Sequence, residues 1–395
     1  MLMRFLILPV FVAGLFMTHQ SRADEYGPDV RVNDCPIILV HGFAGWGPDS
    51  FSLYNYWGGF NDIKAILERS GYTVFAASVG AFSSNWDRAI ELFYQIKGGQ
   101  VDYGEEHCRT HGHLRRPPGM FYDAPLYPRW DADHPVHFIG HSMGGQTLRV
   151  LSALLADKHE MFRDVLLDQD GAAFTPGEGW IKSITTLSAP HNGVTTFNRL
   201  DSPAAMASIV ASLAGIELFN VIPDDLNNYD LPQWEMQRRD GETLEEYIER
   251  IFDTLGDTED FSIRELSTRG AERLNALVNF TTVDRTACYF SVANSQTVAV
   301  PVIPAYVPSV DMSPALLPNS LDIGVSAEFD PLGIGIRWRE NDGIVNTASM
   351  IAPLAGCDDG YVLYDGTARR GVWNYMGKLW WDHGDILGHF QDTQR

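Results

Sequence analysis

Residues 136–151 read VHFIGHSMGGQTLRVL and carry the strongest structural signal in the chain. The apolar start at 136–139 is typical of a buried strand, and 145–151 can open a helix. Between them lies Gly140-His141-Ser142-Met143-Gly144, the pattern G-x-S-x-G. A sharp strand-to-helix turn lifts the central serine into the open, and only small flanking residues let the backbone turn so tightly. The stretch predicts a nucleophile elbow with Ser142 at its tip, against the alternative of a glycine-rich turn with an idle serine.

Strand-like and helix-like segments alternate around this turn. Apolar runs at 36–40, 73–77 and 181–187 are typical of strands, and 62–70 and 86–96 have helical patterns. Strands that alternate with helices indicate a mostly parallel central sheet with helices on both faces. Together with the elbow, this alternation predicts the α/β class and an α/β-hydrolase fold.

A nucleophilic serine in this fold is followed along the chain by an acid and then by a histidine. Two histidines lie far downstream of Ser142, near the C-terminus: His383 and His389. His383 sits in a loop-like stretch, whereas His389 is close to the chain end, where fraying is common. We therefore predict His383 as the general base.

The spacing of residues alone does not decide which aspartate accompanies Ser142 and His383. Asp342 stands in NDGIVN at 341–346, which suits an acid loop but is also an ordinary turn signal. Asp358, Asp359 and Asp365 are the alternatives.

The first predicted strand offers hydrogen-bond donors. The run at 36–40 ends in HGFAGWG at 41–47. A glycine-rich loop at a strand end lets a backbone N–H group approach a developing oxyanion. The second donor would be the N–H of Met143, the residue after the nucleophile.

The first 23 residues have the layout of a secretory signal peptide. Arg4 precedes an apolar run at 5–16, and 21–23 form a small-x-small cleavage site. The run is too short to span a membrane. We expect cleavage after Ala23, a mature domain over 24–395, and a secreted protein that is extracellular or periplasmic.

The net charge and the apolar content of the chain restrict which classes of partner it can bind. A net charge of −22 argues against nucleic acid or an anionic membrane as partner, and no later stretch is long and apolar enough to cross a bilayer. Residues 298–318, rich in Val and Pro, are interpreted as an irregular excursion. Export would permit disulfides, although the sequence does not choose a pairing among Cys35, Cys108, Cys288 and Cys357.

Two insertions add further signals. The stretch at about 86–130 contains side chains of types that bind zinc, although a solvated polar loop is an equal alternative. These side chains are Asp87, His107, His111 and His113. Residues 203–219, within a region at about 195–235, are compatible with an apolar helix that is either a core helix or a lid over an apolar cleft.

Several short sequence motifs follow one another along the chain in a recognisable order. They are PIILVHGFAGWG at 36–47, YWGG at 56–59, SSNWDR at 83–88, VDYG at 101–104, residues 140–147, NDGIVN at 341–346, YDG at 364–366 and GVWN at 371–374. In this order they resemble the zinc-containing thermoalkalophilic bacterial true lipases, from about residue 33 to residue 385. The resemblance implies an α/β-hydrolase that cleaves triacylglycerol esters at an oil–water interface.

The resemblance also implies catalytic roles. NDGIVN matches the family's acid loop, which implies Asp342 as the acid, and His383 matches the family's base. The main-chain N–H groups of Phe43 and Met143 match the oxyanion hole. Met143 stands where the family often has glutamine, a change that leaves the backbone donor in place.

For metals, the resemblance implies four zinc ligands: Asp87, His107, His113 and Asp260. His111 matches a non-ligand. Asp385 matches an acid of the family's calcium site, but the acid and proline that follow it there are absent from ILGHF at 386–390.

Two other functions are compatible with these residues. One is an esterase or polyester hydrolase that uses the same triad with a different cleft. The other is a non-catalytic secreted binding protein on a hydrolase scaffold, against which an intact triad argues.

Overall fold

The computed structural model describes residues 33–48, 54–156, 177–199, 229–279, 283–326, 330–358 and 360–389. Residues from Cys35 onward form one compact unit. The predicted signal peptide and the predicted lid helix at 203–219 lie outside the described residues. Within those ranges, no helix combines the length and the apolar character needed to cross a membrane.

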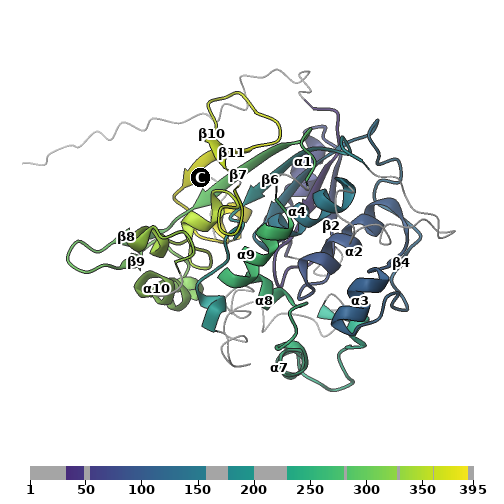
Figure 1. Cartoon of the computed structure of the whole chain (residues 1–395), viewed down its shortest axis with the longest axis horizontal. Coiled ribbons are helices and arrows are strands. Elements are labelled where there is room, and N and C mark those ends of the chain that lie inside the picture. Colours follow the sequence, from purple (N-terminus) through teal and green to yellow (C-terminus); the bar gives the residue numbers. More distant parts are fainter. Residues whose placement is uncertain are drawn as a thin grey trace, which may run out of the picture. The chain divides into compact units, whose positions relative to one another are not determined.

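One parallel sheet of seven strands organises this unit, in the order β10-β11-β7-β6-β5-β1-β2 (Figure 1). Every neighbouring pair in it is parallel, so all the carboxyl ends of the strands lie at one edge. The strands are β1 (Ile37–Val40), β2 (Val74–Ala77), β5 (Val136–His141), β6 (Ile181–Leu187), β7 (Cys288–Asn294), β10 (Tyr361–Leu363) and β11 (Trp373–Leu379). The predicted parallel sheet is confirmed.

The helices follow local signals in the sequence. The side chain of Ser84 accepts a hydrogen bond from the N–H of Asp87 and caps the helix that begins at Asn85. Thr243 and Glu246 form a reciprocal capping box at another helix start. The α-helices are α1 (Ile63–Arg69), α2 (Asn85–Lys97), α3 (Glu105–His111), α4 (Met143–Ala156), α7 (Leu244–Leu255), α8 (Ser262–Leu266), α9 (Thr268–Leu277) and α10 (Leu317–Val325).

Short 3-10 turns and two small strand pairs lie between these helices and strands. The 3-10 turns are η3 (Thr196–Arg199), η5 (Pro232–Trp234), η6 (Pro314–Leu316), η7 (Gly335–Arg339), η8 (Thr347–Met350) and η9 (Asp385–Leu387). Two small antiparallel pairs join β3 (Gly99–Gln100) to β4 (Phe121–Tyr122) and β8 (Thr297–Ala299) to β9 (Tyr306–Pro308).

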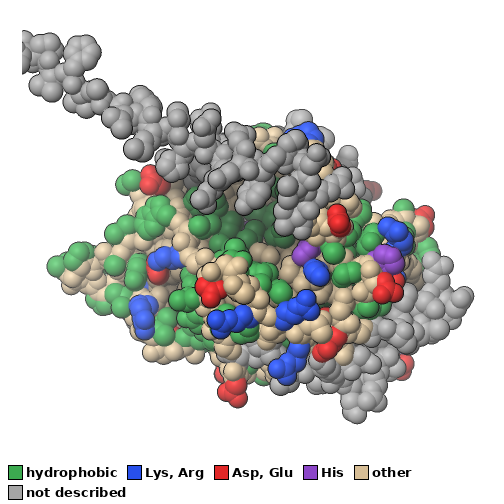
Figure 2. Space-filling view, turned by 90° about the horizontal axis from the view of Figure 1, so that it is seen from above, with side chains coloured by type: hydrophobic (Ala, Val, Ile, Leu, Met, Phe, Trp, Pro, Cys, Tyr) green, Lys and Arg blue, Asp and Glu red, His purple; other side chains and the backbone are tan. Residues whose placement is uncertain are grey.

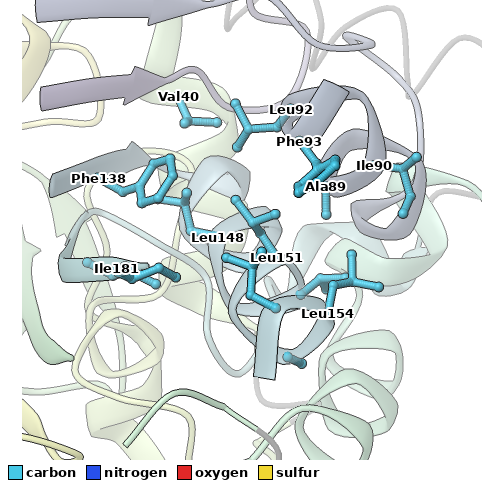
Figure 3. Packing of buried hydrophobic residues seen from close by; sticks show 14 of the residues in the cluster. Val40, Ala89, Ile90, Leu92, Phe93, Phe138, Leu148, Leu151, Leu154 and Ile181 are labelled. Carbon is cyan, nitrogen blue, oxygen red and sulfur yellow. The ribbon is translucent and has the colours of Figure 1, made fainter. Parts of the chain in front are cut away.

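Both faces of the central strands are buried, which explains their continuous apolar runs. Along β1, Ile38 and Val40 point into one hydrophobic cluster and Leu39 into another, because successive side chains of a strand alternate between faces. Figure 3 shows the first cluster, in which side chains of β1, β5 and β6 pack on those of α2 and α4. The sheet is thus fixed between two cores, and its carboxyl edge is left to carry loops.

The segment 298–318, expected to be irregular, contains short regular pieces separated by loops: the end of β8, β9, η6 and the start of α10. Its prolines do not prevent pairing. Pro301 and Pro304 lie in the loop between the two strands, and Pro308 ends β9, so no central ladder donor is lost. All four cysteines are among the described residues, and no disulfide joins them.

Candidate active site and metal centre

The elbow at Ser142 connects β5 directly to α4. Ser142 has a φ of +54°, in the left-handed region that residues other than glycine rarely adopt. A Cβ at Gly140 would lie 2.7 Å from the carbonyl carbon of Gly144, and one at Gly144 would lie 2.4 Å from the carbonyl oxygen of Val40. The turn is therefore possible only with glycine at both flanking positions.

His383 and Asp342 form a buried pair beside the elbow. Nδ1 of His383 lies 2.7 Å from Oδ2 of Asp342, and the backbone N–H of His383 donates to the carbonyl oxygen of Asp342 at 2.9 Å. The other carboxylate oxygen, Oδ1, accepts from the N–H groups of Ile344 (3.0 Å) and Val345 (2.8 Å). Within the described residues, Nε2 of His383 has no hydrogen-bond partner. This nitrogen is thus available to a reacting group.

Ser142 and His383 line the same pocket. Its wall also contains Phe43, Leu316 and Leu387, which make it largely apolar. The structure therefore brings together the predicted serine, base and oxyanion loop at the carboxyl edge of the sheet.

The alternative acids and base occupy other positions. Asp365 faces Arg369 at 3.9 Å on the surface, Asp358 is exposed, and Asp359 lies outside the described residues. His389 also borders the pocket, but its Nε2 donates to the carbonyl oxygen of Tyr56 at 2.7 Å. Burial lowers the pKa of His389 to about 4. Among the candidates for the acid that the structure describes, Asp342 is the one whose carboxylate contacts His383.

The loop after β1 carries Phe43 and is fixed by Arg88, a residue for which the sequence alone indicated no role. The guanidinium of Arg88 is fully buried and donates to the carbonyl oxygens of His41 (2.5 Å) and Gly80 (2.7 Å) and to Oγ1 of Thr147 (3.0 Å). Burial lowers the pKa of Arg88 to about 10, so it stays charged. It connects the loop after β1 to α4, the helix behind the elbow.

Four buried side chains converge elsewhere, between α2, α3 and α8: Asp87, His107, His113 and Asp260. One ligand atom from each lies within 4.8 Å of all the others. Nε2 of His107 is 3.3 Å from Oδ1 of Asp87 and from Oδ2 of Asp260, and Nε2 of His113 is 3.1 Å from Oδ2 of Asp260. Two nitrogens and two carboxylate oxygens facing one point form a group that could hold a metal ion.

Outward atoms of Asp87 and His113 make hydrogen bonds to neighbouring residues. Oδ2 of Asp87 accepts from Nε2 of Gln233 at 2.9 Å, and Nδ1 of His113 donates to the carbonyl oxygen of Leu114 at 3.0 Å. Across the described residues, the four inward ligand atoms have no hydrogen-bond partner. Buried polar atoms are rarely left so, and a cation would satisfy all four at once. His111 lies outside this group, although its ring is 4.6 Å from that of His107.

The predicted calcium ligand, Asp385, is near one other carboxylate. Its Oδ2 accepts from the N–H of Asp382 (3.1 Å) and from Nε2 of Gln296 (3.3 Å). Burial and then the charge of Asp385 raise the pKa of Asp382 to about 6. Both carboxylates accept backbone hydrogen bonds that shape the loop carrying His383.

Comparison with known proteins now gives the family. The model of the lipase-like C-terminal domain matches residues 33–395. The chain belongs to this family. It is 32% identical to a lipase of Staphylococcus hyicus, over 92% of this chain and 55% of that protein, and 33% identical to lipase 2 of Staphylococcus aureus, over 92% and 52%. This family member therefore spans about half the length of the curated relatives it matches.

Solved structures agree with this assignment. EstA from Clostridium botulinum is 34% identical with a TM-score of 0.81, covering 91% of this chain and 84% of that one. Lipase 1 from Pelosinus fermentans is 36% identical with a TM-score of 0.76 (90% and 94%), and the Staphylococcus hyicus lipase is 31% identical with a TM-score of 0.71 (91% and 90%). The predicted family and the predicted α/β-hydrolase fold are confirmed.

Proposed function

We propose that this protein is a lipase that hydrolyses the ester bonds of triacylglycerols, with Ser142 as nucleophile, His383 as base and Asp342 as acid. The observation that carries the proposal is the shared pocket, in which a serine on a strained elbow and a carboxylate-paired histidine face the same space. Relatives named lipase and the lipase-like family model support it.

In the proposed reaction, Nδ1 of His383 stays bonded to Asp342 while Nε2 transfers the protons. Because Nδ1 donates to Asp342, Nε2 carries a lone pair and accepts the proton of Ser142 as its Oγ attacks the ester carbonyl. The tetrahedral intermediate collapses, the alcohol leaves with the proton from Nε2, and an acyl-enzyme remains. Water, deprotonated by the same nitrogen, then releases the fatty acid and restores Ser142.

The oxyanion of that intermediate needs donors that are already in place. We assign this role to the backbone N–H groups of Phe43, just after β1, and Met143, the first residue of α4. Donors held in place before the reaction stabilise the charge without reorganisation, and removing one typically costs about 10²–10³ in rate.

We further propose that the metal is zinc and that it is structural. Asp87, His107, His113 and Asp260 supply nitrogen and oxygen donors, and four protein ligands leave no position for water, as in structural zinc sites. Bound there, zinc would cross-link α2 to the segments around α3 and α8. We keep calcium at Asp385 as a separate proposal, tested by whether added calcium raises the melting temperature of wild type but not of Asp385→Asn.

The zinc proposal predicts about one zinc per purified chain, because the residues that the structure describes contain one such four-ligand group. Chelation should lower the melting temperature before it lowers activity at mild temperature, since a metal bound only by the folded state adds about 4 kcal/mol at a thousandfold excess over Kd. Elemental analysis and thermal unfolding test this, with His113→Ala losing the metal and His111→Ala keeping it. Zinc-free protein from a preparation without chelator contradicts the assignment.

The surface beside the pocket supports a lipid substrate. Residues 298–325, which run from β8 through β9 to the end of α10, contain no Lys or Arg. Val302 is 88% exposed and Val310 fully exposed, and five other large apolar side chains of the segment are also exposed. Figure 2 shows hydrophobic side chains at the end of the molecule to which the β8–β9 loop extends in Figure 1. Leu316, a buried residue of the same segment, lines the pocket.

Variants of this apolar surface distinguish a lipase from the alternative, an esterase or polyester hydrolase. Burying two valine side chains in lipid is worth roughly 3 kcal/mol, and even half of that is about tenfold in partitioning. The double variant Val302→Ser/Val310→Ser should therefore lose about tenfold in rate on emulsified triolein and keep its rate on dissolved p-nitrophenyl butyrate. Phe121→Ser, which changes an apolar side chain exposed on β4, is the control. Equal rates on the emulsion favour the esterase.

We also infer that the protein is secreted, from the predicted signal peptide at 1–23. N-terminal sequencing of exported protein should begin at Asp24, and retention of Met1 would contradict export by this route.

A further inference from the structure

We propose that Tyr56 and His141 form a hydrogen-bond relay that holds the loop after β1 and the loop of His383 at a fixed separation around Ser142. This inference rests on the proposed function, because it assigns positioning roles for the same reaction. Neither residue carries a role in the proposed mechanism.

The relay is a continuous chain of three contacts. The N–H of Gly42 lies 2.8 Å from Oη of Tyr56, which lies 2.6 Å from Nδ1 of His141. Nε2 of the same imidazole lies 3.1 Å from the carbonyl oxygen of His383. The chain therefore begins next to Phe43, passes through the residue before Ser142 and ends on the backbone of the proposed base.

The two ends of the relay fix every proton within it. The backbone N–H of Gly42 can only donate, so Oη of Tyr56 accepts from it. The carbonyl oxygen of His383 can only accept, so Nε2 of His141 carries the hydrogen. A neutral imidazole has one N–H, which leaves Nδ1 as an acceptor, and the hydroxyl of Tyr56 donates to it. The relay is satisfied in this one arrangement only.

The environment keeps His141 neutral, as the relay requires. Its side chain is buried, and burial, followed by the neighbouring His383 and His389, lowers its pKa well below the ordinary value. The ring of His383 lies 4.6 Å from that of His141. A proton on Nδ1 of His141 would also remove the acceptor that Tyr56 uses.

The relay constrains the two parts whose separation the reaction depends on. The backbone of His383 is held from both sides, by its own N–H to Asp342 (2.9 Å) and by His141 to its carbonyl oxygen. At the other end, a Cβ on Gly42 would lie 2.8 Å from Cβ of Ser142 and 3.0 Å from Oη of Tyr56. The loop after β1 thus packs directly on the nucleophile and has no room to shift toward it. A displacement of about 1 Å at such a site can cost on the order of 10² in rate.

The test compares two buried tyrosines: Tyr56, which belongs to the relay and lines the pocket, and Tyr54, which does neither. Tyr56→Phe deletes the relay hydroxyl, whereas Tyr54→Phe deletes a hydroxyl that donates to the carbonyl oxygen of His389 at 3.3 Å. Both side chains are 8% exposed, so loss of a buried hydroxyl is matched. On dissolved p-nitrophenyl butyrate, Tyr56→Phe should lower kcat by about 10–100-fold with KM within about twofold, since the oxyanion donors act in the transition state. Tyr54→Phe should stay within about threefold of wild type for both constants. Equal kinetics for the two variants overturn the relay.

A second measurement does not depend on turnover. Long-range ¹H–¹⁵N NMR of histidine-labelled protein, with the His141 signal assigned by its loss in His141→Gln, should show the Nε2–H tautomer throughout pH 5–8. Tyr56→Phe should disturb this signal and Tyr54→Phe should not. An Nδ1–H tautomer, or titration of His141 between pH 6 and 7, contradicts the relay. If wild type hydrolyses no ester while the tautomer is as expected, the relay stands and the proposed function fails.

Discussion

Asp342→Asn is expected to lower kcat on a dissolved ester by a factor on the order of 10⁴ while the fold stays intact. The reason lies in how the carboxylate is anchored. Its Oδ1 accepts from two backbone N–H groups, of Ile344 and Val345, so an asparagine keeps its oxygen there and turns its NH₂ group toward His383. Nδ1 of His383 must then accept, which leaves the proton on Nε2, where the reaction needs a lone pair.

Steady-state kinetics and thermal unfolding of the same preparations check this expectation. KM should change little, because the pairing acts on the base and not on substrate binding. Asp365→Asn is the control, since this carboxylate lies on the surface opposite Arg369. Near wild-type turnover of Asp342→Asn, with Asp365→Asn inactive, would move the acid to Asp365.

Arg88→Met is expected to give the largest loss of stability, roughly 3–5 kcal/mol, because it removes one member of a buried charge cluster. The guanidinium lies near the buried Glu91 and the half-buried Glu265, and both would lose this neighbouring positive charge. The carbonyl oxygens of His41 and Gly80 would also lose a donor. Since His41 begins the loop that carries Phe43, kcat of the remaining folded protein should fall as well.

The variant Arg149→Met separates the loss of stability from the loss of turnover. Arg149 is equally buried, on α4, but its guanidinium donates to Asn275 (2.7 Å) and to the carbonyl oxygen of Val278 (2.6 Å), on the side of α4 away from the loop after β1. Urea unfolding should show destabilisation in both variants, and kcat per folded molecule should fall only for Arg88→Met. An unchanged kcat in Arg88→Met would limit Arg88 to a structural role.

The sequence was informative where periodicity and local turn chemistry coincide. The run at 136–139, the glycines around Ser142 and the helix behind it predict β5, the elbow and α4, and β1, β2 and β6 follow from their apolar runs. Of these strands, β1, β5 and β6 are central, so both of their faces need apolar side chains; β2 is at the edge of the sheet but is also an apolar run, VFAA. The strands β7, β10 and β11 were not predicted. Leu363 of the edge strand β10 and Met376 of the neighbouring β11 are exposed, which removes the apolar pattern there, and β7 mixes polar and apolar residues (CYFSVAN).

Less of the site could be predicted from the sequence, because the residues that contact one another there lie far apart along the chain. Asp342 and His383 meet across 41 positions, and spacing alone could not prefer Asp342 to the other acids. The roles of Arg88 and Tyr56 depend on buried hydrogen bonds to backbone atoms, which leave no periodic trace in the sequence. The only available signal was their place within the blocks SSNWDR and YWGG.

The central claim is that Ser142 is the nucleophile, and covalent labelling tests it most directly. A phosphonate ester probe carries an electrophilic phosphorus that an activated serine attacks, with loss of the leaving group and formation of a stable P–O bond. Intact-mass and peptide mass spectrometry should find one adduct per chain, at Ser142, formed in step with loss of esterase activity and absent from Ser142→Ala. An adduct on another residue, or full ester hydrolysis by Ser142→Ala, would contradict the account.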